Sequence, residues 1–164
     1  MNLIDLFRSS LVGRRDVTAL EWRHKEGRLE AWTFGDVDIR SNRLAHLLKK
    51  RGLRRGDRLA VYLANRVELI ELYLACVKAG IIFVPINVLY REREVSHVVR
   101  DADPRAVVAA SEFPHPIQAW HCEEIRQESL DSPSEPLDEA FDDDSPAAIV
   151  YTSGTTGTSK GAVL

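Results

Sequence analysis

The 164-residue chain is poor in cysteine and has only a small excess of negative charge, a formal net charge of -3. Its two cysteines, Cys76 and Cys122, are too few for a disulfide framework, so we expect free thiols and a cytoplasmic protein. Lys and Arg number 22 against 25 Asp and Glu, and the basic residues are scattered along the chain. Nothing in this distribution favours nucleic-acid binding, and we expect no nucleic-acid partner.

The sequence also lacks a hydrophobic run suited to a membrane. The longest apolar tract, residues 69–90, includes Glu71 and Lys78, which a helix at the centre of a bilayer would not gather without a function. The first 15 residues carry three arginines, but Asp5 argues against a transit peptide. We expect no transmembrane segment and no leader, and a short helix at residues 3–11 instead.

The chain contains enough apolar material for one packed core, since 45% of its residues are hydrophobic and 29% are charged. Short apolar stretches at 19–22 and 29–32 surround Gly27, which predicts an antiparallel hairpin. Thr33 stands three residues before Asp36, a spacing typical of a capping box, so a helix is expected from there to about residue 51.

The next segments alternate between strand and helix patterns. Asn65 with Glu68 suggests a second helix cap. Strands are expected at 58–63, 81–86 and 106–110, and helices at 66–79 and 91–101. This order predicts an α/β fold, a mostly parallel sheet with flanking helices and an N-terminal β-hairpin.

Two segments offer carboxylates, imidazoles or thiols without predicting a site. Residues 129–145 are rich in Asp, Glu and Pro, and we interpret them as a solvated surface connection. His115, His121 and Cys122 are close in the sequence, but we expect a flexible segment there, which is poor architecture for a metal. Cys76 is expected to be a core residue.

One segment, residues 152–161 (TSGTTGTSKG), has a composition suited to binding an anion. Glycines allow backbone amides to converge on phosphate oxygens, hydroxyls add donors, and Lys160 adds a positive charge. Strands are expected on both sides of it, at 147–151 and from 162 onward. The NTPase loop is excluded because Lys160 is followed by Gly161, and the dinucleotide motif GxGxxG is absent. Composition alone is equally compatible with a flexible polar hairpin tip.

The order of residues in YTSGTTGTSKG, 151–161, resembles the phosphate loop YTSGTTGxPKG of the adenylate-forming superfamily, which includes acyl-CoA synthetases, amino-acid adenylation domains and luciferases. Ser159 is the one departure, because proline is usual there. Residues 32–65 and 74–87 are similar to upstream segments of the same family. The resemblance covers nearly the whole chain and implies that residues 1–164 are the N-terminal part of an AMP-binding domain, truncated just after the loop.

The resemblance implies an ATP-dependent acyl-CoA synthetase. In such an enzyme a carboxylate attacks the α-phosphate of ATP to give an acyl-adenylate and pyrophosphate, and the thiol of coenzyme A then displaces AMP. The implied partners are a small carboxylic acid, ATP, Mg²⁺ and coenzyme A. The residues that would hold the β- and γ-phosphates are Thr152, Ser153, Gly154, Thr155, Thr156, Gly157 and Lys160.

Ser159 carries information about the subfamily. The loss of proline frees φ, so we expect a looser loop before ATP binds. Serine in this position, together with residues 85–87 and 101–104, resembles the malonyl-CoA and methylmalonyl-CoA synthetase branch. A medium- or long-chain fatty acyl-CoA ligase is the alternative within the superfamily.

In the family, the adenine, ribose, Mg²⁺ and catalytic-lysine positions follow the phosphate loop, so no catalytic residue and no metal ligand is assigned in residues 1–164. We therefore expect this chain alone to be inactive, and its last strand to leave apolar edges that promote aggregation. A second hypothesis, from another class, is a non-catalytic α/β binding or interaction module that uses the loop as a surface tip.

Overall fold

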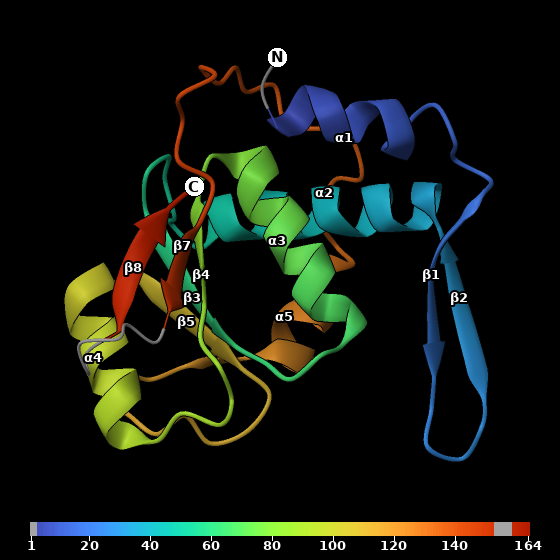
Figure 1. The fold of residues 1–164 in the computed structure, drawn as a ribbon. Helices are drawn as coiled ribbons and strands as arrows, with labels where there is room; N and C mark the ends of the chain where they lie inside the picture. The colour runs from blue at the N-terminus through green and yellow to red at the C-terminus, as the bar shows by residue number, and fades with distance from the viewer. Residues whose placement is uncertain (1–2, 153–158) are drawn as a thin grey trace.

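A computed structural model describes residues 3–152 and 159–164, and it confirms the α/β class with an N-terminal hairpin (Figure 1). The helices are α1 (Leu3–Leu11), α2 (Phe34–Lys50), α3 (Val67–Ala79), α4 (Glu92–Ala102) and α5 (Cys122–Ser129). The strands are β1 (Thr18–Arg23), β2 (Leu29–Thr33), β3 (Arg58–Tyr62), β4 (Ile82–Pro85), β5 (Ala106–Ala109), β6 (Trp120–His121), β7 (Ile149–Thr152) and β8 (Lys160–Val163).

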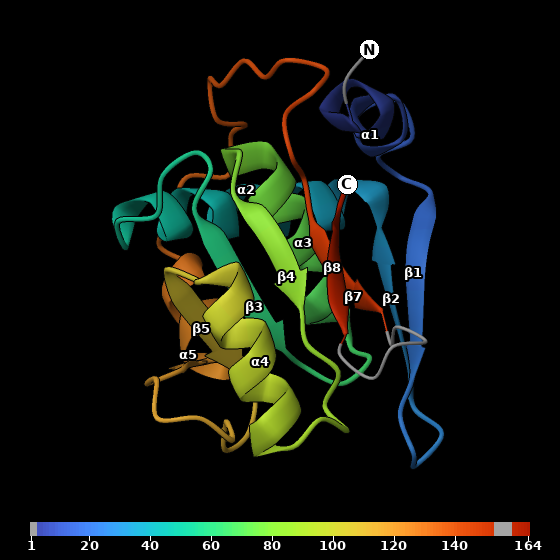
Figure 2. The ribbon, with the colours of Figure 1, turned by 60° about the vertical axis from the view of Figure 1, so that its left-hand side comes forward.

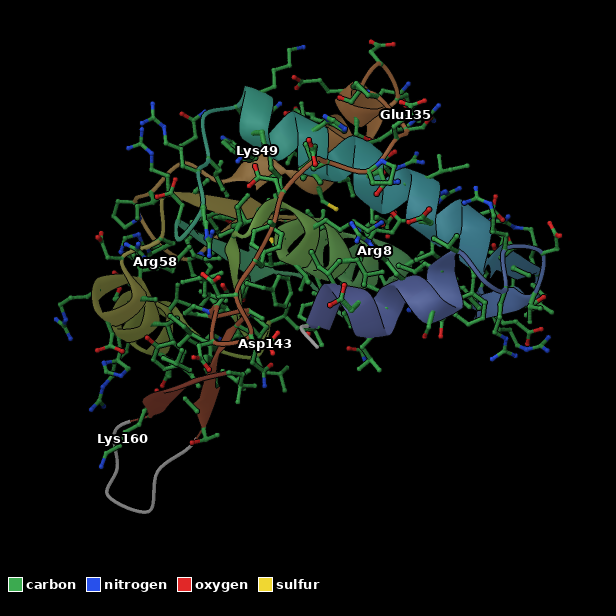
Figure 3. All side chains as sticks on the ribbon, turned by 90° about the horizontal axis from the view of Figure 1, so that it is seen from above. Arg8, Lys49, Arg58, Glu135, Asp143 and Lys160 are labelled. Carbon is green, nitrogen blue, oxygen red and sulfur yellow. The ribbon has the colours of Figure 1, made fainter. Side chains whose placement is uncertain are left out.

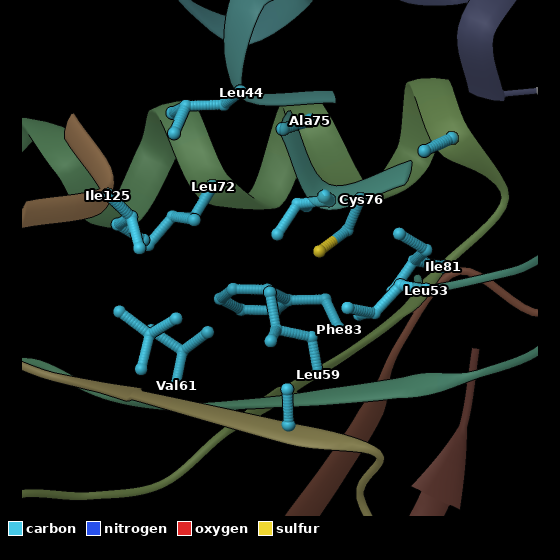
Figure 4. Close-up of a cluster of buried hydrophobic side chains, with 14 of the residues drawn as sticks. Leu44, Leu53, Leu59, Val61, Leu72, Ala75, Cys76, Ile81, Phe83 and Ile125 are labelled. Carbon is cyan, nitrogen blue, oxygen red and sulfur yellow. The ribbon is translucent and has the colours of Figure 1, made fainter. Parts of the chain in front are cut away.

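The central sheet has the strand order β4-β3-β5-β6, and all of its neighbouring strands are parallel. Because side chains alternate along a strand, β3 contributes to two cores. Leu59 and Val61 pack with residues of α2, α3 and α5, whereas Ala60 and Tyr62 pack with residues of α4. Figure 4 shows the first core between α3 and the sheet. Helices thus cover both faces, as buried parallel strands require (Figure 2).

The capping box predicted at the start of α2 is confirmed. The Thr33 hydroxyl accepts a hydrogen bond from the Asp36 amide at 3.1 Å, and the Asp36 carboxylate accepts one from the Thr33 amide at 2.9 Å. The cap predicted at Asn65 is wrong, because α3 is preceded by Arg66, which makes no side-chain cap bond. The Glu68 carboxylate binds the Arg66 guanidinium instead, at 2.7 Å.

The flexible segment expected around residues 115–122 is also wrong in part. Trp120 and His121 form β6, which pairs with β5, and Cys122 begins α5 with its thiol buried. The buried stripe of α5 consists of Cys122, Ile125 and Ser129, which is too short and too polar to signal a helix from sequence. In the part of the chain that the structure describes, no helix has both the length and the apolar composition to cross a bilayer.

Candidate phosphate-binding site

The segment predicted to bind phosphate follows β7, and β7 lies beside β4 at one edge of the central sheet. The Phe83 amide donates to the Ala147 carbonyl at 3.0 Å, and Phe83 and Ala148 form a parallel bridge. β7 therefore runs in the same direction as the central strands, and its last residue, Thr152, lies at their carboxyl ends. Open α/β sheets usually bind their ligands at the carboxyl ends of their strands.

β7 and β8 form an antiparallel hairpin in which Thr152 pairs with Lys160. Both residues are exposed, and Lys160 lies at the outer end of the hairpin, away from the body of the molecule (Figure 3). β8 begins at Lys160, two residues before the expected start of a strand, so Lys160 belongs to the hairpin stem. The other predicted ligands, Ser153, Gly154, Thr155, Thr156 and Gly157, lie outside the described residues.

The stem is built into both cores of the domain. Ala148 and Val150 pack on the α2 and α3 side of the sheet, whereas Ile149 and Tyr151 pack on the α4 side. The backbone of Leu164 is also paired, because its amide donates to the Ala148 carbonyl at 2.9 Å and its carbonyl accepts from Ala147 at 2.7 Å. The side chains of Val163 and Leu164 are nevertheless exposed, so the last strand does present apolar groups to solvent, as the sequence predicts.

Helix α4 contacts both ends of the predicted loop. The Tyr151 hydroxyl donates to the Asp101 carboxylate at 2.5 Å, and burial together with this bond raises the pKa of Tyr151. On the other side of the loop, Nε2 of His97 lies 2.7 Å from the Ser159 carbonyl oxygen. Sequence analysis missed His97 and Asp101, although their spacing of four residues places them on one face of a helix.

Gly161 allows Tyr151 to lie across β8. A Cβ atom on Gly161 would be 2.8 Å from Cγ2 of Ile149 and 3.1 Å from Cζ of Tyr151. Any larger residue would have to displace the tyrosine ring or its neighbour. The glycine that ends the motif is thus explained by the close approach of a side chain from the paired strand.

A second concave region, of about 770 Å³, lies between the β1–β2 hairpin and the N-terminus of α3. It contains three arginines, but each is already paired with a glutamate: Arg40 with Glu71, Arg66 with Glu68 and Arg126 with Glu123. Its charges are thus balanced internally, which makes it a weaker candidate for an anion than the loop beside Lys160.

The described residues contain no cluster of three potential metal-binding side chains. Among residues 3–152 and 159–164, no three His, Cys, Asp or Glu side chains are grouped so that they could hold an ion. Cys76 is fully buried, and burial raises the pKa of its thiol. Burial also raises the pKa of Cys122, to about 11, so both thiols are suited to packing and poorly suited to nucleophilic chemistry.

The layered α/β sheet with the β7–β8 hairpin beside β4 matches the fold of the N-terminal domains of adenylate-forming enzymes. The chain belongs to the AMP-binding enzyme family, whose model matches residues 7–164. It is 35% identical over 151 residues to the fatty acid–[acyl-carrier-protein] ligase ScoC of Streptomyces coeruleorubidus, a match that covers 80% of this chain and 28% of ScoC.

Two further relatives fall in the same superfamily. The chain is 32% identical over 142 residues to a feruloyl-CoA synthase from Amycolatopsis, covering 82% of this chain and 28% of the synthase. The N-terminal subdomain of Klebsiella oxytoca NpsA matches with a TM-score of 0.82 and 25% identity, over 99% of this chain and 41% of that one. The chain thus spans about 28% of the length of ScoC and about 28% of the length of the feruloyl-CoA synthase.

Proposed function

We propose that this chain supplies the ATP-phosphate-binding part of a ligase that activates a carboxylic acid as its acyl-adenylate. The observation that supports it best is the position of Lys160, which pairs with Thr152 at the outer end of a hairpin on the carboxyl edge of the sheet. In this proposal residues 1–164 are the N-terminal part of the AMP-binding domain.

The chemistry requires that the β- and γ-phosphates be held while the acid attacks the α-phosphate. Lys160 offers an ammonium group, Thr152 a hydroxyl, and the proposal assigns the remaining donors to Ser153, Gly154, Thr155, Thr156 and Gly157. Mg²⁺ bound with ATP would share the phosphate charge.

We propose coenzyme A as the acceptor of the acyl group, which makes the complete protein an acyl-CoA synthetase. Similarity to a feruloyl-CoA synthase supports this choice. Similarity to ScoC favours a second candidate, transfer to an acyl carrier protein. Ser159 favours a malonyl- or methylmalonyl-type acid over a longer fatty acid, and the two buried free thiols accord with a cytoplasmic location.

The acceptor is tested by incubating the complete protein with ATP, a panel of acids and either coenzyme A or a phosphopantetheinyl carrier protein. We expect AMP release coupled to acyl-CoA formation. Acylation of the carrier protein alone would replace the first acceptor with the second. If no acid supports AMP release, the non-catalytic binding module becomes the better hypothesis.

Phosphate binding is tested by titrating ATP and inorganic triphosphate into the purified chain and into a Lys160→Ala variant. We expect the substitution to lower the affinity for ATP and for triphosphate roughly tenfold, because a charged hydrogen bond to phosphate is lost. Lys25→Ala is the matched control, since Lys25 is an exposed lysine of the β1–β2 turn. Equal affinities for the Lys160→Ala variant and the unaltered chain would contradict the proposal.

A further inference from the structure

Two side chains of α4 each contact one end of the loop that the proposed function assigns to ATP. Asp101 binds Tyr151, the residue before Thr152, and His97 binds Ser159, the residue before Lys160. We propose that His97, Asp101, Tyr151 and Gly161 form an anchor that fixes both ends of the loop against α4 and thereby sets its affinity for ATP. This inference rests on the proposed function and names positioning residues for it.

The contact at the first end is a charge-assisted hydrogen bond at the exposed surface of α4. Tyr151 donates to a carboxylate at 2.5 Å, and hydrogen bonds to charged acceptors are about twice as strong as neutral ones. Its ring also packs with the apolar core beneath α4, and it meets the His97 ring edge to face at 6.1 Å between centroids. Tyr151 therefore connects β7 and the core with both His97 and Asp101 of α4.

The contact at the second end is directed at the backbone. A carbonyl oxygen can only accept, so Nε2 of His97 must carry the hydrogen that lies between it and Ser159. The neutral tautomer with Nε2–H and the imidazolium can both make this bond. The contact restrains the chain one residue before the proposed phosphate-binding ammonium of Lys160.

The helix that carries the anchor is itself firmly held. Val95, Val98 and Val99 of α4 are buried against the sheet, and His97 and Asp101 project from a different side of the same turns. Gly161 completes the arrangement, because a Cβ atom there would lie 2.8 Å from Cγ2 of Ile149 and 3.1 Å from Cζ of Tyr151. Helix α4 thus connects both ends of the loop to the core of the domain.

The anchor has a consequence for Ser159. Serine leaves φ free where proline would fix it, which adds conformational entropy that binding must remove. The His97 bond to the Ser159 carbonyl supplies a restraint at the same residue. We therefore expect proline at position 159 to compensate for loss of His97, since a proline keeps its carbonyl and limits its own φ.

The first test compares Tyr151→Phe and His97→Leu with the unaltered protein. We expect about fivefold weaker ATP binding for each, a typical coupling between a positioning contact and a ligand, with unchanged thermal unfolding. In the complete protein the KM for ATP should rise by a similar factor while the KM for the acid stays constant. Asp101→Asn and His97→Gln, which keep an acceptor and a donor, should retain most of the affinity.

Matched controls come from the same residue types elsewhere in the fold. Tyr73→Phe alters a partly buried tyrosine of α3, and His46→Leu removes a histidine that contacts the Glu135 carbonyl oxygen at 3.0 Å. Neither should change ATP affinity. An equal loss in these controls would show a general effect of destabilisation and would overturn the anchor.

The second test combines His97→Leu with Ser159→Pro. We expect the double variant to regain ATP affinity to within about twofold of the unaltered protein. Such a rescue would not occur if His97→Leu acted by unfolding the protein. Failure of this rescue would overturn the claim that His97 restrains Ser159. If Lys160→Ala weakens ATP binding but Tyr151→Phe and His97→Leu do not, only the anchor fails. If Lys160→Ala leaves ATP binding unchanged, the proposed function itself fails.

Discussion

At the scale of single residues, Glu71 is a carboxylate that the fold buries almost completely. It lies on α3 with 1% of its side chain exposed, and its carboxylate accepts from Nη1 of Arg40 at 3.1 Å. Burial raises the pKa of Glu71, and Arg40 opposes that rise. Arg40 also lies over the Trp32 ring, at 5.6 Å from its centroid, so one guanidinium joins α2, α3 and the N-terminal hairpin.

Arg40→Ala should destabilise the chain by roughly 2–3 kcal/mol at pH 7.5, because it leaves a buried carboxylate without its cation. The loss should shrink toward pH 5. In the variant the folded pKa of Glu71 lies further above its unfolded value, so the folded state binds the proton more tightly and stability falls as pH rises. Urea unfolding at the two pH values measures this.

Glu71→Gln combined with Arg40→Ala is the control for that experiment. It removes the titrating group, so the extra pH dependence of the Arg40→Ala variant should disappear. A stability loss in Arg40→Ala that is the same at pH 5 and pH 7.5 would mean that Glu71 does not carry the effect.

At the scale of elements, the two helix starts at α2 and α3 differ in how their first amides are satisfied. Thr33 and Asp36 cap each other at α2, and hydrogen bonds from Thr33 lower the pKa of Asp36. At α3 the corresponding carboxylate, Glu68, is bound by Arg66 at 2.7 Å. Asn65 is exposed and lies one residue outside the cap position.

Thr33→Ala should therefore cost about 1 kcal/mol of unfolding free energy, the usual loss for an N-cap. Asn65→Ala, its counterpart at α3, should cost less than about 0.5 kcal/mol, as at other surface positions. Chemical denaturation of both variants measures the difference. Equal losses would mean that the hydrogen bonds of the capping box do not account for the stability of α2.

Most elements could be predicted because their apolar spacing and their end signals agree. Gly27 and Gly80 adopt the positive φ that the hairpin turn and the end of α3 require, and β3, β4 and β5 are continuous apolar runs. β6 and α5 could not be predicted, since both are short and few of their residues are buried and apolar. The α4 contacts to Tyr151 and Ser159 span 50 and 62 residues, and no local rule encodes such pairings.

At the scale of the whole molecule, the acidic segment between α5 and β7 binds back onto the body. Figure 3 shows it passing from Glu135, beside α2, to Asp143, near the β7–β8 hairpin. The Ser134 carbonyl accepts from Nδ2 of Asn42 at 2.8 Å, and Glu139 binds Lys49 at 2.6 Å. These contacts tie the surface connection expected from sequence to α2.

Arg55 is the main cation at the end of this segment. Its guanidinium donates to the Ala140 carbonyl, to Asp142 and to Ser145 at 3.1–3.3 Å, and it lies over the Phe141 ring. The Phe141 ring in turn lies over Gly80, where a Cβ atom would be 2.4 Å away. One arginine therefore fixes the stretch of chain that leads into β7.

Arg55→Ala should release this stretch locally without unfolding the domain, because the bonds lost are solvent-exposed and belong to a loop. We expect cleavage after Glu139 by a glutamate-specific protease to accelerate about fivefold, and amide exchange over residues 138–146 to rise in parallel. The free energy of unfolding measured in urea should change by less than about 0.5 kcal/mol, as for a surface substitution. Arg54→Ala, at the exposed neighbouring residue, is the matched control and should leave both rates unchanged. Unaltered cleavage and exchange in the Arg55→Ala variant would show that the apolar contact of Phe141 with Gly80 holds the segment by itself.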